Sequence, residues 1–125
     1  IRALPTQFQA YIPGTNVRVH VAGDCVFATE ITSDAVDYRY ARREGKEAEM
    51  CPVELPAEVA ERCLLLSKWL RLPFCGIDLK RTSDGEYYCF EVNPSPAYSY
   101  YQEQTGQPIA DALIRYLETG AGAPP

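Results

Sequence analysis

Hydrophobic and polar residues alternate most regularly along two stretches near the middle of the chain, residues 74–81 and 87–93. In the first stretch, apolar side chains fall at the odd positions from 75 to 79, and Asp78 and Lys80 fall at even ones. A period of two is typical of a strand with one buried face. Asp84-Gly85 separates the stretches and is a strong turn signal, because glycine tolerates positive φ. The pattern predicts a β-hairpin from Phe74 to Pro96.

The register of this hairpin follows from its turn. A two-residue turn, or a four-residue loop, places Asp78 opposite Glu91 and Gly76 opposite Asn93. Opposed side chains lie about 5 Å apart at Cβ, so the two carboxylates repel each other unless a cation lies between them. Asn93 adds a neutral oxygen on the same face, and an all-oxygen set suits Mg²⁺ or Mn²⁺ rather than zinc. We therefore predict a divalent-metal platform, of a kind that usually shares its ion with substrate phosphates.

Alternation in the second strand predicts which side chains face the core. The inner face is expected to carry Tyr88, Phe90 and Val92, and the outer face Tyr87, Cys89, Glu91 and Asn93.

Weaker alternation and turn signals predict the remaining strands. They are a loose strand at Thr6–Ile12, clean strands at residues 16–22 and 25–31 around the Gly23-Asp24 turn, and a short edge strand at Val36–Tyr40. Residues 42–54 are charged with a central glycine, which suits a mobile surface loop.

Two stretches have helical spacing. Residues 56–72 begin at a proline, carry one apolar stripe and stop at Pro73. Leu65 and Trp69 are expected to widen that stripe. A second helix is predicted over residues 108–117, ended by Gly120.

These elements predict an α+β fold, a mainly antiparallel β-sheet with the two main helices packed on one face. The opposite face is expected to be polar and open, so that something docks there. It carries Arg18, His20, Asp78, Lys80, Glu91 and Asn93.

Composition narrows the function classes. The 125 residues have 46% hydrophobic content, a net charge of −5 and five scattered cysteines without a CxxC motif. The acidic balance argues against nucleic acid or an anionic membrane as the main partner. No apolar run approaches the roughly 20 residues that span a bilayer. Reduced thiols in a cytoplasmic protein are expected.

Two segments, GTNVRVHVAGDCVFATEI and GIDLKRTSDGEYYCFEVNPSPAYSYYQEQTGQPIADAL, carry a family resemblance. Together they resemble the C-terminal half of the ATP-grasp fold, most closely the glutathione synthetase and RimK-like branch, which includes graspetide-type peptide ligases. The resemblance extends from about Gln7 to Leu117. It implies a C-terminal subdomain over residues 1–120 of a larger protein, followed by a disordered tail at 121–125.

The resemblance also implies roles for individual residues. Asp78, Glu91 and Asn93 match the Mg²⁺ ligands, with Glu91 bridging two ions. Arg18 matches the arginine of the D-I/V-R segment, which lies near the nucleotide phosphates or the acyl-phosphate.

Further positions match the nucleotide side of the family's site. The segment Gln9-Ala10-Tyr11-Ile12 matches the hinge whose backbone meets the adenine of ATP. Arg39 falls where a second phosphate- or substrate-facing arginine is common, and Lys80 is carried over as a nucleotide contact from its position. The chain departs from the family at Ala10, where an acidic ribose contact is usual, and at Asn16, where Asp is usual. The family also has an N-terminal half that carries nucleotide-contacting lysines and a glycine-rich loop, and this half is expected in another part of the larger protein.

The resemblance implies an ATP-dependent carboxylate–amine ligase that works through an acyl-phosphate, with ATP and Mg²⁺, or Mn²⁺, as cofactors. The carboxylate and the amine are not identified, and the isolated chain is expected to be inactive. The alternative is a non-catalytic nucleotide- or metal-binding module, or a protein-interaction module, and a homodimer through the exposed face is a further expectation. The single histidine, His20, is better explained as a strand residue beside the site or in a polar network than as a catalyst, and Cys75 and Cys89 lack a base that would make them nucleophiles.

Overall fold

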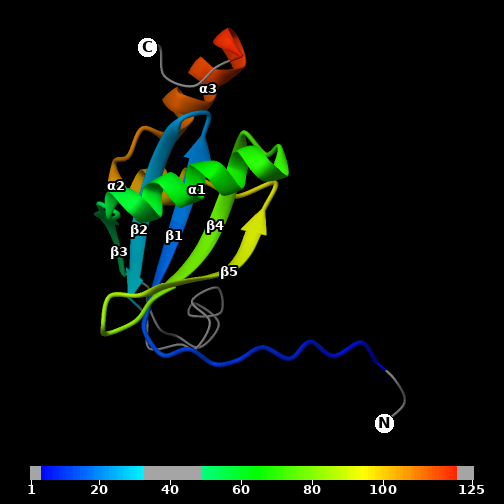
Figure 1. Ribbon diagram of the computed structural model, residues 1–125. Coiled ribbons are helices and arrows are strands. Elements are labelled where there is room, and N and C mark those ends of the chain that lie inside the picture. Colours follow the sequence, from blue (N-terminus) through cyan, green and yellow to red (C-terminus); the bar gives the residue numbers. More distant parts are fainter. Residues whose placement is uncertain (1–3, 33–48, 121–125) are drawn as a thin grey trace.

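The computed structural model describes residues 4–32 and 49–120 as five strands and three helices (Figure 1). In chain order the elements are β1 Thr15–Ala22, β2 Cys25–Thr32, β3 Glu49–Val53, α1 Ala57–Leu70, β4 Phe74–Arg81, β5 Tyr87–Asn93, α2 Ser99–Thr105 and α3 Ile109–Thr119. The strands form one antiparallel sheet in the order β3-β2-β1-β4-β5. The predicted α+β class is confirmed.

One face of the sheet packs against α1, which crosses it in Figure 1. The valines of β1 alternate as predicted, and Val17, Val19 and Val21 are almost completely buried there. Ile77 of β4 and Cys63 of α1 complete the centre of this core.

The other face is covered in part by α2 and the start of α3. Ile31 of β2 packs there with Tyr101 of α2 and Ile109 of α3 in a second hydrophobic cluster. The prediction that both main helices lie on one face is therefore wrong. Helical periodicity shows that each helix buries a stripe, but it does not show which face of the sheet receives that stripe. The polar face is consequently open only beyond the region that α2 and α3 cover.

Two further segments differ from their predicted secondary structure. Glu49–Val53 forms β3, which pairs with β2, whereas the sequence predicted a loop across residues 42–54. Pairing with β2 supplies the backbone hydrogen bonds that make a charged, proline-containing segment a strand. Residues 4–14 contain no strand, although Thr6–Ile12 was predicted as one. The predicted edge strand at Val36–Tyr40 and the tail at 121–125 lie outside the described residues.

The hairpin of β4 and β5 reaches its predicted register by an unexpected route. Thr82 donates its N–H to the carbonyl of Glu86 (2.8 Å), so the loop has three residues and Gly85 has φ +85°. Such a loop alone would place Asp78 opposite Phe90. An irregularity next to Asp78 leaves Phe90 without a partner residue, and this bulge restores the pairing of Asp78 with Glu91.

The bulge reverses the predicted faces near the turn. Tyr87 packs against the α1 core, whereas Tyr88 pairs with Lys80 and is 42% exposed. The prediction had these two tyrosines the other way round, because strict alternation was counted through the position where the bulge adds a residue.

Helix α1 begins and ends within two residues of its predicted bounds, but its buried apolar face is narrower than predicted. Leu65 and Trp69 point to solvent, and Trp69 is 89% exposed. The short helix α2 was not predicted as an element. None of the helices in the described ranges is long and apolar enough to cross a membrane.

A comparison of two substitutions tests these placements. Ile77→Val removes one methylene from a side chain with no exposure, and it is expected to lower the free energy of unfolding by about 0.5–1.5 kcal/mol. Trp69→Ala removes a whole indole from the surface, and it is expected to change that free energy by less than about 0.5 kcal/mol. Urea titrations of both variants measure the difference. A larger loss for Trp69→Ala would mean that this side chain is packed in solution.

Candidate functional site

Three rows of side chains cross β1, β4 and β5 on the polar face. The rows are Asn16–Lys80–Tyr88, Arg18–Asp78–Glu91 and His20–Gly76–Asn93. Side chains that face each other across neighbouring strands lie within contact distance. The structure therefore brings the three predicted metal ligands and Arg18 together on adjacent rows, with β1 adding a third strand to the predicted hairpin.

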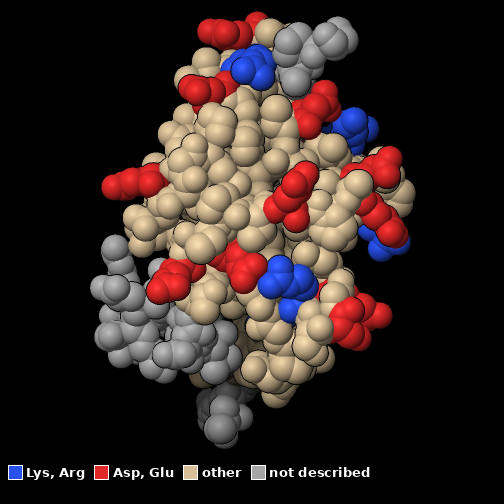
Figure 2. All heavy atoms as spheres, turned by 90° about the vertical axis from the view of Figure 1, so that its left-hand side faces the viewer, with Lys and Arg blue, Asp and Glu red and all other residues tan. Residues whose placement is uncertain are grey.

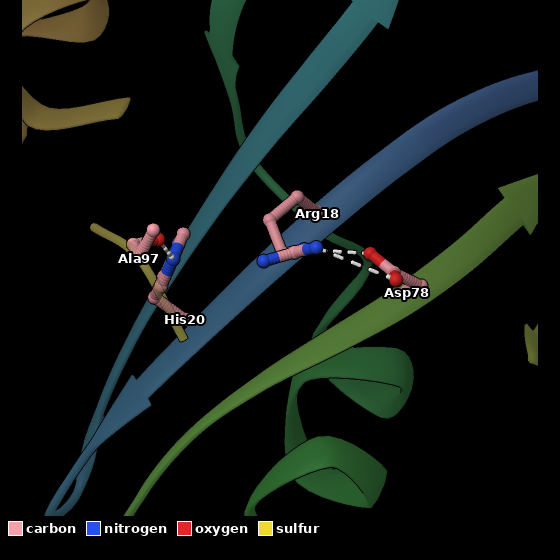
Figure 3. Close-up of polar contacts among 4 residues, drawn as sticks. All are labelled: Arg18, His20, Asp78 and Ala97. Carbon is pink, nitrogen blue, oxygen red and sulfur yellow. Dashed lines mark hydrogen bonds and ion pairs between the residues drawn. The ribbon is translucent and has the colours of Figure 1, made fainter. Parts of the chain in front are cut away.

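The middle row contains a partly buried ion pair (Figure 3). The Arg18 guanidinium donates to both carboxylate oxygens of Asp78, from Nε to Oδ1 at 2.6 Å and from Nη2 to Oδ2 at 3.4 Å. The side chains of Arg18 and Asp78 are 8% and 20% exposed. The ring of Tyr101 lies 5.3 Å from the guanidinium carbon, a cation–π distance. Arg18 is thus held between a carboxylate and an aromatic ring.

This pair changes the argument about carboxylate repulsion. The hairpin register suggested that a cation must lie between Asp78 and Glu91. Arg18 already supplies a positive charge to Asp78, so the repulsion by itself does not require a metal. The hairpin by itself lacks this cation, because Arg18 belongs to β1, 60 residues away in the sequence.

Asn93 ends β5 with its side chain already ordered. Its Oδ1 accepts a hydrogen bond from the Ser95 backbone N–H at 2.9 Å. A carbonyl oxygen has two lone pairs, so one remains for a further partner. Glu91 is exposed and lies directly opposite Asp78. Two carboxylates and an amide oxygen on adjacent rows fit a hard cation such as Mg²⁺.

That donor set contains only two of the usual metal-binding side chains. Within residues 4–32 and 49–120, no three His, Cys, Asp or Glu side chains converge in a way that could hold a metal ion. Asn93 is the third donor of the predicted set, and Mg²⁺ commonly completes its coordination with water and substrate phosphates.

His20 lies in the third row and is completely buried. Its Nε2 is 3.0 Å from the carbonyl oxygen of Ala97, so Nε2 carries the proton and donates (Figure 3). Burial lowers the pKa of His20 from 6.5 to about 4; the bond to Ala97 opposes this shift, and the charge of Arg18 adds to it. His20 is therefore neutral at pH 7 and belongs to a polar network, as the sequence suggested.

The predicted nucleotide hinge approaches the first row. The Lys80 ammonium lies 5.9 Å from the centre of the Tyr11 ring, although Tyr11 is 73% exposed. Gln9 and Ala10 are exposed, and residues 4–13 extend away from the sheet (Figure 1). Lys80 itself is 8% exposed. The structure thus places Tyr11 of the predicted hinge beside Lys80, whereas Arg39 lies outside the described residues.

The buried cysteines are poor candidates for chemistry. Burial raises the pKa of the Cys63 thiol to about 11, with the neighbouring thiols of Cys89 and Cys75 adding to the shift. Burial also raises the pKa of Cys75, against a hydrogen bond with Ser67 that lowers it. Protonated thiols are weak nucleophiles, which agrees with the sequence-based expectation.

A groove of about 590 Å³ lies away from these rows, between β2, the segment after β3 and the start of α1. Apart from Glu54 and Gln107 its lining is apolar. Gln107 donates from Nε2 to the carbonyl of Ala28 at 2.9 Å and so pairs with β2. Seen from the β3 edge, charged side chains, most of them acidic, surround a broad uncharged area (Figure 2). The groove offers no set of oxygen ligands comparable with the rows.

Two residues near the rows were not recognised from the sequence. Tyr101 contacts both Arg18 and the ring of His20, with a centroid distance of 4.8 Å to the latter. Gly76 interrupts an otherwise apolar and polar alternation, and a glycine inside a strand signals close approach of another segment. That signal was present in the sequence but was not used.

This α+β fold, whose antiparallel sheet presents two carboxylates and an amide beside a buried arginine, fits the ATP-grasp class that the sequence resembles. Residues 2–117 match the model of the RimK-like ATP-grasp domain, and the chain belongs to this family. The resemblance noted in the sequence is confirmed.

Curated relatives and solved structures agree with this family assignment. The chain is 28% identical over 110 residues to the "Probable alpha-L-glutamate ligase" of Stutzerimonas stutzeri (strain A1501), covering 87% of this chain and 36% of the relative. It is similar to the ATP-grasp ligase PsnB complexed with a phosphomimetic variant of minimal precursor, Mg and ADP. The TM-score is 0.69 at 30% identity, covering 86% of this chain and 34% of PsnB.

A second solved structure is the macrocyclase MdnC of Microcystis aeruginosa MRC bound with precursor peptide MdnA. Its TM-score is 0.65 at 27% identity, covering 88% of this chain and 35% of MdnC. The chain thus spans about a third of the length of the proteins that it matches.

The lowered pKa of His20 predicts a pH-dependent stability. Unfolded His20 binds a proton below pH 6.5, whereas folded His20 does so only below about pH 4. The contribution of neutral His20 to the free energy of unfolding is therefore fully present above pH 6.5. It is lost as the pH falls toward 4, and the loss is about 3 kcal/mol at most. The carboxylates also titrate, so the measurement is the difference in unfolding free energy between the wild type and His20→Gln, at pH 7 and pH 4.5. A difference that does not change with pH would contradict the assignment.

Proposed function

We propose that this chain forms the Mg·ATP-binding part of an ATP-dependent carboxylate–amine ligase. The observation that carries the proposal is the register of Arg18, Asp78 and Glu91 across three strands, with Asn93 in the next row. Membership of the RimK-like ATP-grasp family supports it, as does the likeness to PsnB, whose structure contains Mg and ADP. Asp78, Glu91 and Asn93 would hold Mg²⁺, with Mn²⁺ as an alternative ion.

The remaining residues would serve the nucleotide. The backbone of Gln9–Ile12 would meet the adenine, and Lys80, which lies beside Tyr11, is proposed as a nucleotide contact from the resemblance. Arg18 orients Asp78 through its two donors, and contact of Arg18 with a phosphate or an acyl-phosphate is a further proposal. Arg39 is proposed for a second phosphate- or substrate-facing role from the resemblance alone.

The proposed reaction activates a carboxylate as an acyl-phosphate, which an amine then attacks to form an amide or peptide bond. Bound Mg²⁺ would neutralise charge on the phosphates. The side chains of this chain would contribute positioning and electrostatic stabilisation rather than covalent chemistry. The relatives include ligases named for glutamate and ligases solved with precursor peptides, so the carboxylate and amine are proposed to belong to amino acids or peptides. The cytoplasm, where ATP is available, is the expected location.

A non-catalytic binding module is the second candidate. Two observations favour it: Ala10 has no side chain that reaches a ribose, and Asp78 is already neutralised by Arg18. A module of this kind would bind metal or nucleotide weakly, or a protein partner, without turnover. Self-association through the exposed surface belongs to the same candidate.

Glu91→Gln distinguishes the two candidates. In the full-length protein that carries this chain, we expect the variant to lose Mg·ATP turnover, because an amide supplies one neutral oxygen where the carboxylate supplies charge. Glu91 is exposed, so the melting temperature is expected to stay close to that of the wild type. A phosphate-release assay and thermal unfolding measure the two properties. Unchanged ATP consumption would remove Glu91 from the proposed site.

The isolated chain is expected to bind Mg·ATP weakly. It spans about a third of its relatives' length, and the hinge residues Gln9 and Ala10 are exposed, so the nucleotide would remain largely open to water. Isothermal titration calorimetry of the 125-residue chain with ATP and Mg²⁺ measures the dissociation constant. A value in the micromolar range would contradict this expectation.

A further inference from the structure

The third row, His20–Gly76–Asn93, has no side chain at its centre. The segment Pro94–Ala97, which we call the clasp, leaves the end of β5 and returns over this gap. A Cβ added to Gly76 would lie 2.8 Å from the Cβ of Pro96 and 3.2 Å from Nη1 of Arg18. The distance to Pro96 is shorter than real Cβ contacts, whereas the distance to Arg18 is tight but could be relieved by a small shift of its side chain. The close packing of Pro96 on the sheet therefore requires glycine at position 76.

The first anchor of the clasp is the hydrogen bond from the Ser95 N–H to Oδ1 of Asn93. Pro94 and Pro96 have no N–H, so Ser95 is the single backbone donor between Asn93 and Ala97. This donor also decides which way the amide of Asn93 points, because only the oxygen accepts. The clasp therefore presents Asn93 as an oxygen ligand before any ligand binds.

The second anchor is His20. Its Nε2 donates to the carbonyl of Ala97 at 3.0 Å, and the ring of Tyr101 packs against the His20 ring in an edge-on arrangement. Nδ1 of His20 is buried and has no hydrogen-bond partner within the described ranges. A buried polar atom without a partner is costly, so packing alone does not explain a histidine here. The donor to Ala97 is the property that an apolar residue would lack.

Asn93 needs these anchors because of its position. β5 is the outermost strand of the described sheet on this side, and Asn93 is its last residue. The ends of edge strands open locally more readily than central strands. Without the clasp, only pairing with Gly76 of β4 would hold Asn93 in place.

We propose that His20 and Gly76 are positioning residues, which hold the clasp so that Asn93 is fixed as a metal ligand. The proposal deepens the function proposed above and rests on Asn93 being a ligand of the divalent ion. In this proposal His20 holds Ala97, and the clasp then holds Ser95 against Asn93. His20 itself contacts neither substrate nor metal.

The test uses the 125-residue chain, with Mn²⁺ as the probe. His20→Leu removes the donor to Ala97, and His20→Gln is the conservative variant because its amide nitrogen can replace Nε2. Ile31→Val is the control, since it shortens a buried side chain of β2 that packs against Tyr101 on the same face but takes no part in the hydrogen bonds of the clasp. The measurements are Mn²⁺ affinity by electron paramagnetic resonance, exchange of the Ser95 N–H by NMR in the absence of metal, and unfolding by urea.

With His20→Leu we expect the Ser95 amide to exchange at least about tenfold faster and Mn²⁺ to bind about 10–100-fold more weakly. His20→Gln should recover most of both losses, and Ile31→Val should leave both properties near wild type. Equal effects of His20→Leu and Ile31→Val would overturn the proposal in favour of general destabilisation. Wild-type exchange and affinity in His20→Leu would overturn it directly.

Two further outcomes keep the result interpretable. If the wild type binds no Mn²⁺, the role of Asn93 as a ligand in the isolated chain fails, while turnover of Glu91→Gln in the full-length protein still tests the proposed function and the exchange of Ser95 still reports whether His20 holds the clasp. If His20→Leu does not fold, Gly76→Ala tests the clasp from the sheet side, because the added Cβ displaces Pro96. Slow exchange of Ser95 in Gly76→Ala would then contradict the proposal.

Discussion

The ion pair between Arg18 and Asp78 is the interaction on which the polar face depends. It joins the central strand β1 to β4 across 60 residues of sequence, at 2.6 Å and with little exposure. Burying either charge alone would be costly, so each residue requires the other in place. The sheet therefore carries a positive and a negative group in its middle row. An apolar pair could pack at the same place, but it would offer no charged group to a ligand.

This pair also explains how the candidate site is prepared. Arg18 holds the carboxylate of Asp78 in one orientation, and Glu91 stays exposed on the open side of β5. The clasp orders Asn93 in the neighbouring row through a different set of hydrogen bonds. A site whose ligands are ordered in advance loses less entropy when it binds a cation or a phosphate. The proposed ligase function and the role of His20 both depend on this preparation.

The register of the hairpin was predicted correctly, although its loop and its bulge were not. Pairing of Asp78 with Glu91 was expected from an even-numbered turn, but the loop has three residues and a bulge at Phe90 compensates. The faces of Tyr87 and Tyr88 were consequently reversed. Alternation in a sequence does not show where one strand has gained a residue, because the bulge exists only in the paired sheet.

The sequence by itself determined the strands β1, β2, β4 and β5 and the helices α1 and α3, through the valines of β1, the apolar stripe of α1 and the alternation of the hairpin. It did not determine β3 or α2, whose residues carry no clear period. It also carried the family resemblance. Only the tertiary structure placed β1 between β2 and β4, Arg18 against Asp78, and α2 and α3 on the face opposite α1. The physical reason is that periodicity records whether a side chain is buried, whereas the partner that buries it comes from a distant part of the chain.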